Sequence, residues 1–426
     1  MTDSGLTAHL RSAISTRRPV GVFVASLLVT LGFWAIVPVR SRPDMGTDYQ
    51  SFYEPVARSI LAGRGFRLED QRPATRYPPG YPLLLASLFG LSAWLNLSEG
   101  VMLSAFALLG MGLTSILVFS TARTVWGVRP ALASSLIWMT YPGALWLTKQ
   151  PNSEIPFVLV FYGTLSLFWS ALLRQRRAWP VYFLCGLLAG VAMLIRPMAI
   201  GVGLVMAAML WLASREAALW RRLMLTGMLL LGNLAVIFPW QAWVYAQTGS
   251  VVLLSTGGAP SMRDGLTFGI NSKAYRQGSQ AAPQDVAALM QDISARYDGL
   301  QSVGNIASLM AEELRARPLA VAKLLAIKLA RSWYGTDSQQ FEAPIMLIQV
   351  IYLLLALWGS QVAWRQGGAA KWLAVMIGAM VLYFWGMTVL VLSILRYMVP
   401  VMGLLFTLIP GGFYTHRGGG VRHGAL

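Results

Sequence analysis

The chain has 426 residues, of which 56% are hydrophobic and only 12% are charged, and its mean hydropathy is +0.57. This composition excludes an ordinary soluble domain and indicates a polytopic membrane protein. The formal net charge is +17. Because no aromatic-basic RNA-binding motif accompanies that charge, we attribute it to topology and to affinity for anionic membrane lipid, and we expect no nucleic-acid partner.

Apolar segments long enough to cross about 30 Å of hydrocarbon recur along the chain. A helix satisfies its own backbone hydrogen bonds in lipid, so these segments predict an all-α polytopic membrane protein with about ten transmembrane helices. The fifth and sixth are short for full spans and are expected to be tilted or incomplete. The predicted spans are 20–38, 100–122, 131–148, 155–173, 180–195, 198–213, 223–246, 343–364, 372–393 and 397–413.

These spans divide the chain into three parts. Residues 1–246 form an N-terminal transmembrane module that contains a first external loop at 39–99. An external segment with interfacial helices occupies 247–342, and transmembrane helices with a short basic tail occupy 343–426. Residues 1–38 are interpreted as an uncleaved first span, since no small-residue cleavage site follows the apolar stretch.

Helical patterns recur in both external segments. In the first, 49–62 has helical spacing and ends at a glycine pair, whereas 82–95 is too short to cross and is predicted to be re-entrant or interfacial. In the second, 285–317 is helical in composition. The spacing of Leu324, Lys328 and Arg331 predicts a basic amphipathic helix at the lipid headgroups.

Lysines and arginines gather on alternate turns of this topology. Such loops are retained in the cytoplasm, so the pattern predicts a protein of the cytoplasmic (inner) membrane with both termini inside. Of the 17 acidic residues, only Asp3 and Glu216 fall on the cytoplasmic side by this assignment. Both long segments then lie on the external or periplasmic face, where we expect the active site.

Asp48 precedes the helical pattern of the first external loop. One interpretation is an N-terminal helix cap. The other is a general base at the membrane surface. Partial burial would raise the pKa of this carboxyl group toward the working pH. Asp44 is the rival for that role, although the neighbouring Pro43 favours a turn.

The segment Arg76-Tyr-Pro-Pro-Gly-Tyr-Pro82 contains three prolines, which fix an extended entry into the helical pattern that follows. Arg76 is suited either to bidentate binding of a phosphate or to snorkelling at the headgroups. Tyr77 and Tyr81 are candidates for the substrate site.

Five further polar positions, including the substrate-site candidate Lys149, lie at the external ends of spans. Glu154 is interpreted as a helix cap, as the partner of Lys149 in an ion pair, or as a group facing a functional cavity. Arg196 and Arg396 place guanidinium groups near the outer surface, where with Arg76 they converge on one anion or act as interfacial anchors. Tyr397, beside Arg396, is a substrate-site candidate.

Several other chemistries lack their residues. His9, His416 and His423 all fall in predicted cytoplasmic tails, so neither a histidine metal site nor a Ser-His-Asp arrangement is expected outside. No Walker or dinucleotide glycine motif is present. No cofactor is required by the residues, and a divalent ion bound by carboxylates such as Asp48 and Glu154, with Asp44, is left open.

The motifs, in their order, resemble those of the GT-C glycosyltransferases, in particular the protein O-mannosyltransferase and lipid A aminoarabinose transferase group (family 39-like). They are the first-loop Asp48, the helix ending Leu-Ala-Gly-x-Gly-Phe, Tyr-Pro-Pro-x-Tyr-Pro, Ser153-Glu154, Arg196-Pro197 and Arg396-Tyr397. Two departures concern the acids: Tyr49 stands where the family often has Glu, and Glu154 where it frequently has Asp.

The resemblance implies a GT-C fold and an inverting transferase that moves a sugar from a polyprenyl-phosphate donor to a glycan, lipid or protein acceptor. It assigns the catalytic base to Asp48 and the donor-phosphate contact to Arg76, with Arg196 and Arg396 as further candidates. A transporter or a flippase of lipid-linked glycans is the non-enzymatic alternative, but it favours functional charge at mid-bilayer. An O-antigen-ligase-like transferase would need a histidine in a late external loop, and none is there.

Overall fold

The computed structural model describes residues 3–37, 48–174, 178–252, 254–267 and 282–414. Helices make up the described chain, with an isolated β-bridge between Arg67 and Pro73 and no strand in these ranges. The predicted all-α class is therefore confirmed.

In the described ranges, six helices are long and apolar enough to cross a membrane. Five shorter apolar helices accompany them: α3 (Gly80–Trp94), α8 (Trp179–Ile195), α9 (Val202–Ala213), α18 (Val399–Phe406) and α19 (Ile409–Tyr414). This pattern agrees with a multi-pass membrane protein. The six long helices are α1 (Asp3–Ile36), α4 (Glu99–Trp126), α7 (Glu154–Leu173), α10 (Leu219–Thr248), α16 (Glu342–Gln366) and α17 (Gly368–Leu390).

Two of the predicted spans are interrupted. The span predicted at 131–148 consists of α5 (Val128–Thr140) and α6 (Pro142–Leu147), because Tyr141 is extended before Pro142. The span predicted at 397–413 consists of the short helix η4 (Leu395–Tyr397) followed by α18 and α19. Hydropathy averages over such breaks, so the sequence indicated continuous spans where the structure has jointed ones.

The pair α8 and α10 packs through glycines on both helices. A Cβ on Gly186 would overlap the carbonyl of Leu229, and one on Gly232 would overlap the carbonyl of Phe183. Close approach through small residues is a common means of helix association in membranes. It fixes the axis of α8, and Arg196 follows the end of that helix directly.

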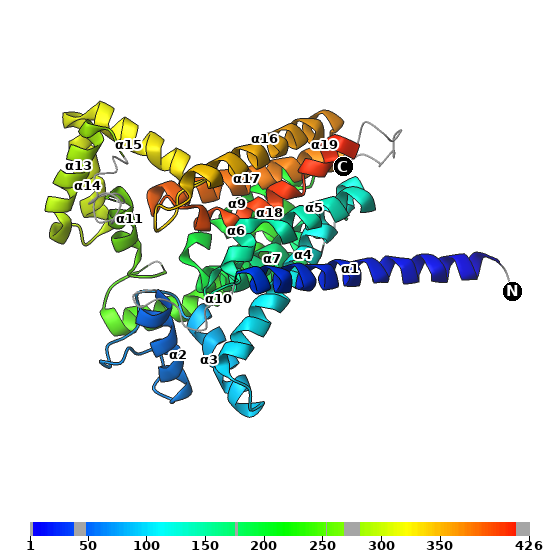
Figure 1. The fold of residues 1–426 in the computed structure, drawn as a ribbon, viewed down its shortest axis with the longest axis horizontal. Coiled ribbons are helices and arrows are strands. Elements are labelled where there is room, and N and C mark those ends of the chain that lie inside the picture. Colours follow the sequence, from blue (N-terminus) through cyan, green and yellow to red (C-terminus); the bar gives the residue numbers. More distant parts are fainter. Residues whose placement is uncertain (1–2, 38–47, 175–177, 253, 268–281, 415–426) are drawn as a thin grey trace.

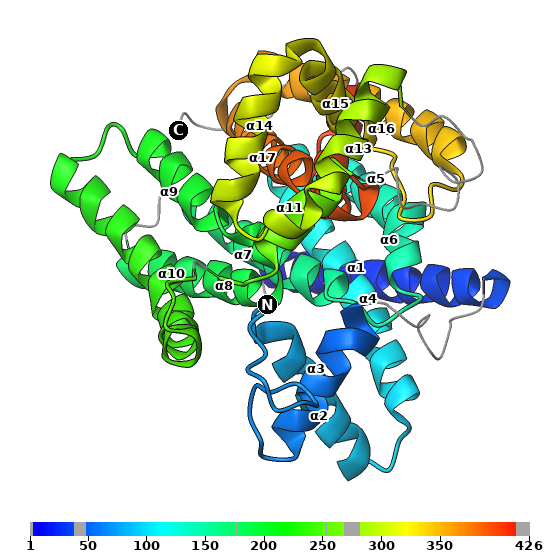
Figure 2. The same ribbon diagram turned by 90° about the vertical axis from the view of Figure 1, so that its left-hand side faces the viewer.

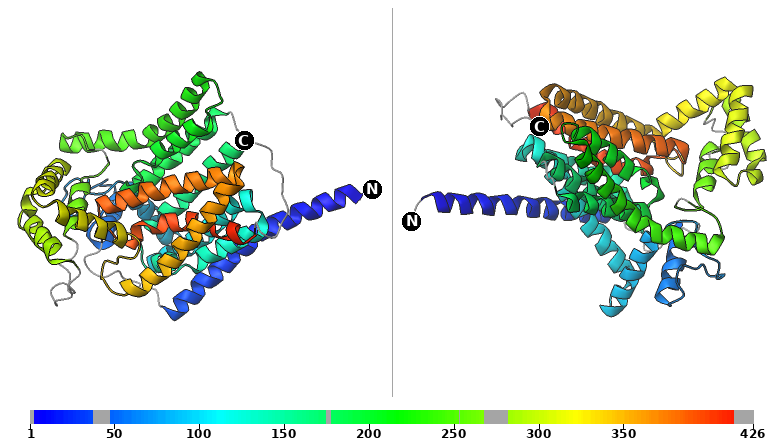
Figure 3. Two further views of the ribbon diagram at one scale, coloured as in Figure 1. Left: turned by 90° about the horizontal axis from the view of Figure 1, so that it is seen from above. Right: turned by 180° about the vertical axis from the view of Figure 1, so that it is seen from behind.

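The two long segments between spans gather at one end of the bundle, and both chain termini lie toward the other (Figure 1). In the first segment, the π-helical turn η1 (Tyr49–Tyr53) and α2 (Glu54–Leu61) precede α3. Gly63 and Gly65 have φ of 72° and 74°, which ends α2 as predicted. Figure 3 shows α1 extending past the other helices at its N-terminal end.

The second segment forms a helical unit with its own apolar core (Figure 2). In this core, Val286, Leu289 and Ile293 of one helix pack with Leu324 of another. The helices of this unit are α11 (Gly258–Leu266), α13 (Gln284–Ala295), α14 (Val303–Ala316) and α15 (Pro318–Arg331), with the short turn η3 (Tyr297–Gly299).

The basic helix predicted at 318–333 exists as α15, but its cations do not face lipid headgroups. Lys328 is 1% exposed, and its amine nitrogen donates to the carbonyls of Gly265 at 2.6 Å and Val391 at 2.8 Å. Arg331 is buried and forms an ion pair with Glu342. The headgroup prediction is wrong for these two residues, because Lys328 joins α15 to α11 and to the end of α17, and Arg331 joins it to the start of α16.

Candidate functional site

Asp48 and Tyr77 form a hydrogen-bonded pair at the end of the bundle where the long segments gather. Asp48 precedes η1 but makes no capping hydrogen bond, so its interpretation as a helix cap is not supported. Instead, the hydroxyl of Tyr77 donates to Oδ1 of Asp48 at 2.9 Å. The helical turn that follows is of the π type, which is rare and frequently found at functional sites.

Aromatic rings surround this pair. The ring of Tyr53 lies 5.1 Å from that of Tyr77 and 4.9 Å from that of Tyr81, and Phe52 packs on edge against Tyr77. Burial raises the pKa of Tyr77 above its ordinary value, and the nearby Asp48 carboxylate raises it further. Tyr77 therefore stays protonated and holds the carboxylate as a donor.

Arg76 lies beside this pair and is exposed. Its guanidinium lies over the Tyr77 ring, 5.3 Å from the ring centre, and makes no ion pair with a residue that the structure describes. Its backbone carbonyl accepts a hydrogen bond from the amide of Gly257 at 3.1 Å. A Cβ on Gly257 would come within 2.6 Å of that oxygen, so a glycine is needed where the segment between α10 and α16 meets Arg76.

Gly80 explains part of the Tyr-Pro-Pro-Gly-Tyr-Pro motif. A Cβ at this position would lie 2.6 Å from the backbone carbon and oxygen of Leu194 and 2.8 Å from the amide nitrogen of Ile195. The start of α3 thus touches the end of α8, one residue before Arg196. This contact brings the segment between α1 and α3 to a second group of charges.

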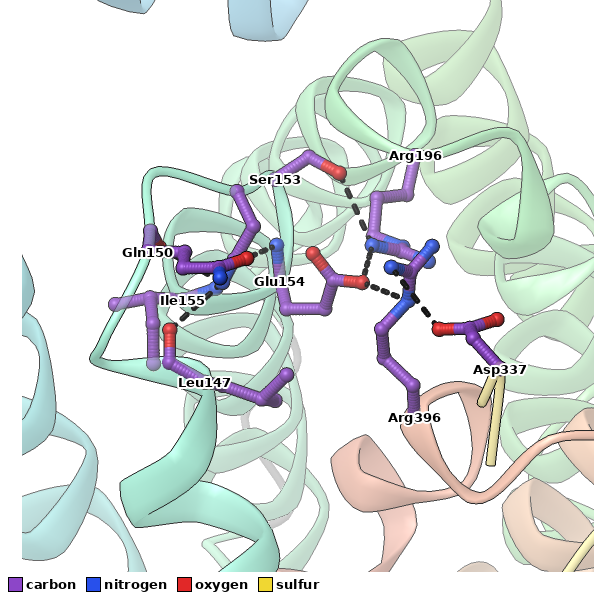
Figure 4. A network of polar contacts seen from close by, with 9 residues as sticks. Leu147, Gln150, Ser153, Glu154, Ile155, Arg196, Asp337 and Arg396 are labelled. Atoms are coloured by element: carbon purple, nitrogen blue, oxygen red, sulfur yellow. Dashed lines mark hydrogen bonds and ion pairs between the residues drawn. The ribbon is translucent and has the colours of Figure 1, made fainter. Parts of the chain in front are cut away.

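That second group is centred on Glu154, which is 2% exposed (Figure 4). Oε1 of Glu154 lies 2.7 Å from Nη1 of Arg196 and 2.8 Å from Nε of Arg396. Nη1 of Arg196 also donates to Oγ of Ser153 at 3.0 Å, and Arg396 lies 3.8 Å from Asp337. Three helical elements and the chain before α16 therefore meet at one buried carboxylate.

Asn152 was not singled out by sequence reasoning, although it holds Glu154 in place. Its Oδ1 accepts from the amides of Glu154 at 3.1 Å and Ile155 at 3.4 Å, while its Nδ2 donates to the carbonyl of Leu147 at 2.7 Å. An asparagine just before a helix is a recognised signal for this kind of turn. It joins α6 to the first turn of α7.

Two tyrosines connect the Asp48 pair with the Glu154 group. Arg196 and Arg396 lie over the ring of Tyr397, 5.2 Å and 5.5 Å from its centre. Burial raises the pKa of Tyr53 above its ordinary value; the charges of Asp48 and Glu154 add to this rise, and Arg196 opposes it. Tyr53, whose ring packs against those of Tyr77 and Tyr81, therefore lies between the two groups of charges.

The structure changes several of the assignments around this site. Arg196 and Arg396 converge on one anion, which is Glu154 of the protein, whereas Arg76 lies apart from them over the Tyr77 ring. The ammonium of Lys149 lies over the Trp146 ring at 4.2 Å. Asp44 lies outside the described residues.

A divalent ion does not fit at Glu154, because the two guanidinium groups already neutralise its carboxylate and would repel a cation. In the described ranges, no cluster of three or more His, Cys, Asp or Glu side chains is suited to a metal.

The middle of the chain matches a known protein family. The model of the dolichyl-phosphate-mannose-protein mannosyltransferase family matches residues 77–243, which include Tyr77, Glu154 and Arg196. No curated protein matches the chain.

Two solved structures resemble the whole chain. One is the archaeal oligosaccharyltransferase AglB from Archaeoglobus fulgidus, in complex with an inhibitory peptide and a dolichol-phosphate, with 14% identity and a TM-score of 0.56. That likeness covers 93% of this chain and 50% of AglB, so the chain spans half the length of that protein. The other is ArnT from Cupriavidus metallidurans bound to undecaprenyl phosphate, with 18% identity, a TM-score of 0.42, and coverage of 91% and 77% of the two chains.

The likeness to AglB concerns the fold, and the family match covers part of the site but leaves out Asp48, Arg76 and Arg396. Both agree with the family that the motifs indicated. The chain has the fold of the GT-C superfamily of glycosyltransferases.

Proposed function

We propose that the protein is an inverting glycosyltransferase that moves a sugar from a polyprenyl-phosphate donor to a hydroxyl-bearing glycan, lipid or protein acceptor. The site would face the external side of the cytoplasmic membrane, with both termini in the cytoplasm. AglB was solved with a dolichol-phosphate, which supports a lipid-phosphate donor for a chain of this fold.

This proposal rests on one observation. Asp48 has a half-buried carboxylate, and beside it lies the exposed Arg76, which makes no ion pair with a described residue. Tyr77 holds Oδ1 of Asp48, whereas Oδ2 has no hydrogen-bond partner among the described residues. One oxygen is therefore fixed and the other can accept a proton. Arg76, over the ring of the same Tyr77, supplies a cation for the leaving group.

These groups account for a single displacement. The acceptor hydroxyl attacks the anomeric carbon as its proton passes to Oδ2 of Asp48. The bond between the anomeric carbon and the phosphate oxygen breaks, and its electron pair leaves with the polyprenyl phosphate. Arg76 stabilises the charge that develops on this leaving group. One carboxylate suffices because no covalent sugar-enzyme intermediate forms.

The Glu154 group would complete the phosphate side of the site. Nη1 of Arg196 forms an ion pair with Oε1 of Glu154 and donates to Oγ of Ser153, and Nη2 of the same guanidinium has no partner among the described residues. We assign Glu154 the role of orienting Arg196 and Arg396, so that their remaining donors point toward a phosphate oxygen. This arrangement limits the positive charge of the empty site, because the carboxylate offsets part of it.

The test is sugar transfer by membranes that contain the Asp48→Asn variant, supplied with the cell's own lipid-linked donors. We expect loss of the glycosylated product, detected by mass spectrometry of glycans and lipids, with unchanged expression. Asp70→Asn is the matched control, since Asp70 is a carboxylate of the same external loop whose ion-pair partner among the described residues is the exposed Arg72. Transfer retained by Asp48→Asn would refute the assignment of the base. Movement of lipid-linked glycan without a new glycosidic bond would instead indicate a flippase.

A further inference from the structure

A cavity lies at the end of the bundle opposite Asp48 and Glu154. Its volume is about 540 Å³, and it is lined by the ends of α7, α8, α9, α10 and α17. Glu154 begins α7, and Leu173, the last residue of the same helix, lines this cavity. A helix of 20 residues is about 30 Å long, so the cavity is separate from the candidate active site.

The walls and the mouth of this cavity differ in chemistry. Trp169, Leu173, Tyr182, Leu210 and Trp372 form apolar walls. The volume lies within the range of about 300 to 1,000 Å³ that is typical of ligand sites.

The connection from α9 to α10 forms the mouth of the cavity and carries Arg215, Glu216 and Arg221. Arg215 and Glu216 are exposed and Arg221 is half-buried. None of these three side chains has a hydrogen bond or an ion pair with another residue that the structure describes.

The neighbouring Arg222 provides a contrast. Its Nη2 donates to the carbonyl of Trp211 at 2.9 Å, and its guanidinium lies 4.0 Å from the centre of that ring. Arg222 therefore has a structural role within the protein, whereas Arg215 and Arg221 present two cations, against one carboxylate, at the mouth of an apolar cavity.

We propose that this cavity binds an anionic glycerophospholipid, with the headgroup phosphate at Arg215 and Arg221 and an acyl chain against the apolar wall. Basic pockets between transmembrane helices are known to take anionic headgroups. Trp179 and Trp220, at the starts of α8 and α10, are 49% and 76% exposed. Exposed tryptophans at helix ends mark the membrane interface, so the mouth lies at headgroup depth.

The excess of positive charge selects an anionic lipid over a zwitterionic one. Glu216 would repel the lipid phosphate moderately and would attract an ammonium headgroup. Replacing Glu216 with glutamine should therefore strengthen binding of phosphatidylglycerol. The same change would weaken binding of phosphatidylethanolamine if that lipid were the ligand.

The test measures phospholipid binding to purified full-length protein in detergent by native mass spectrometry. We expect dioleoylphosphatidylglycerol to bind more tightly than dioleoylphosphatidylcholine. The Arg215→Ala/Arg221→Ala variant should weaken phosphatidylglycerol binding roughly thirtyfold, about fivefold for each arginine. The matched control is Arg129→Ala/Arg365→Ala, which removes two exposed arginines from the same end of the bundle that do not line the cavity.

A second variant separates the acyl chain from the charge. Ala213→Phe fills part of the cavity, keeps every charge, and should also weaken phosphatidylglycerol binding, while glycerol 3-phosphate without acyl chains should not bind. Equal losses in the two double-arginine variants, no preference of the wild type for phosphatidylglycerol, or weaker binding by Glu216→Gln would overturn the proposal. If the double variant fails to fold, wild-type preference and Ala213→Phe decide it. Sugar transfer is not part of the readout, so the result is independent of the proposed function.

Discussion

Tyr77 shows how a single side chain positions the candidate base. Its hydroxyl donates to Asp48, and burial keeps that hydroxyl protonated over the physiological range. The sequence marked Tyr77 as a substrate-site candidate within a proline-rich motif. Its partner was not evident, because Asp48 and Tyr77 are brought together by the fold of the segment between α1 and α3.

Replacing Tyr77 with phenylalanine removes this hydrogen bond and leaves the ring in place. A hydrogen bond to a charged group contributes about 1.5 to 3 kcal/mol, so we expect the turnover number to fall about tenfold to a hundredfold. The KM for the donor should change little, because Arg76 is retained. Steady-state kinetics with purified protein and lipid-linked donor would measure both constants.

Tyr81→Phe serves as the control for this change, since the hydroxyl of Tyr81 makes no hydrogen bond to a described residue. A purely structural role for Tyr77 would lower the amount of folded protein and leave the turnover number of the remainder intact. That outcome would contradict its role in positioning Asp48.

Glu154 illustrates how the structure narrows several interpretations of one residue. A cap, a partner for Lys149 and a group in a functional path all agreed with the sequence. The structure gives its carboxylate two arginines that lie far away along the chain, and it assigns the turn before α7 to Asn152. Burial of a carboxylate between two guanidinium groups requires the tertiary fold, so local sequence patterns could not indicate it.

At the scale of elements, the contact between α3 and α8 positions the tyrosines around Asp48 relative to Arg196. Gly80 allows the start of α3 to touch the backbone at the end of α8. The tyrosines of the first loop then lie near Arg196. The sequence explained the prolines of this motif as a fixed entry into a helix, but the need for glycine arises from a neighbour that is distant in sequence.

Gly80→Ala should therefore displace α3 from α8. A Cβ would lie within 2.6 Å of backbone atoms, which cannot rotate away as a side chain does. We expect a destabilisation of about 1 to 3 kcal/mol, typical of overpacking, together with reduced sugar transfer. Thermal unfolding in detergent would measure the first effect.

Gly100→Ala is the control for this change, because no atom lies within 4 Å of a Cβ at that position. The melting temperature of this variant should be unchanged or slightly higher. Equal melting temperatures for the two variants would contradict this account.

At the scale of the whole molecule, Lys328 links the helical unit of α11 to α15 to the membrane helices. Burial, with a contribution from nearby Arg331, lowers the pKa of Lys328 from 10.5 to about 7. A neutral amine has two N–H groups, and Lys328 makes two hydrogen bonds, to the carbonyls of Gly265 and Val391. The unfolded chain binds this proton up to a higher pH than the folded protein does.

The stability of the protein should consequently rise with pH between about 7 and 10, by up to about 1.4 kcal/mol per pH unit from this residue. This contribution is complete above the unfolded pKa and is lost as the pH falls through the folded value. Lys328→Met should remove this part of the pH dependence, whereas Lys323→Met, which removes an exposed lysine of the same helix, should retain it. Melting temperatures measured across this pH range would test the expectation, and an unchanged slope for Lys328→Met would refute it.

The sequence by itself determined the membrane class, the positions of the apolar helices and the identity of most candidate residues. Hydropathy and helix signals are local, so they can be recognised in short segments of the sequence. Only the tertiary structure decided that Lys328 lies inside the protein and that Arg196 and Arg396 meet at Glu154. Both depend on groups distant in sequence, whose burial and charge become coupled only when the helices pack.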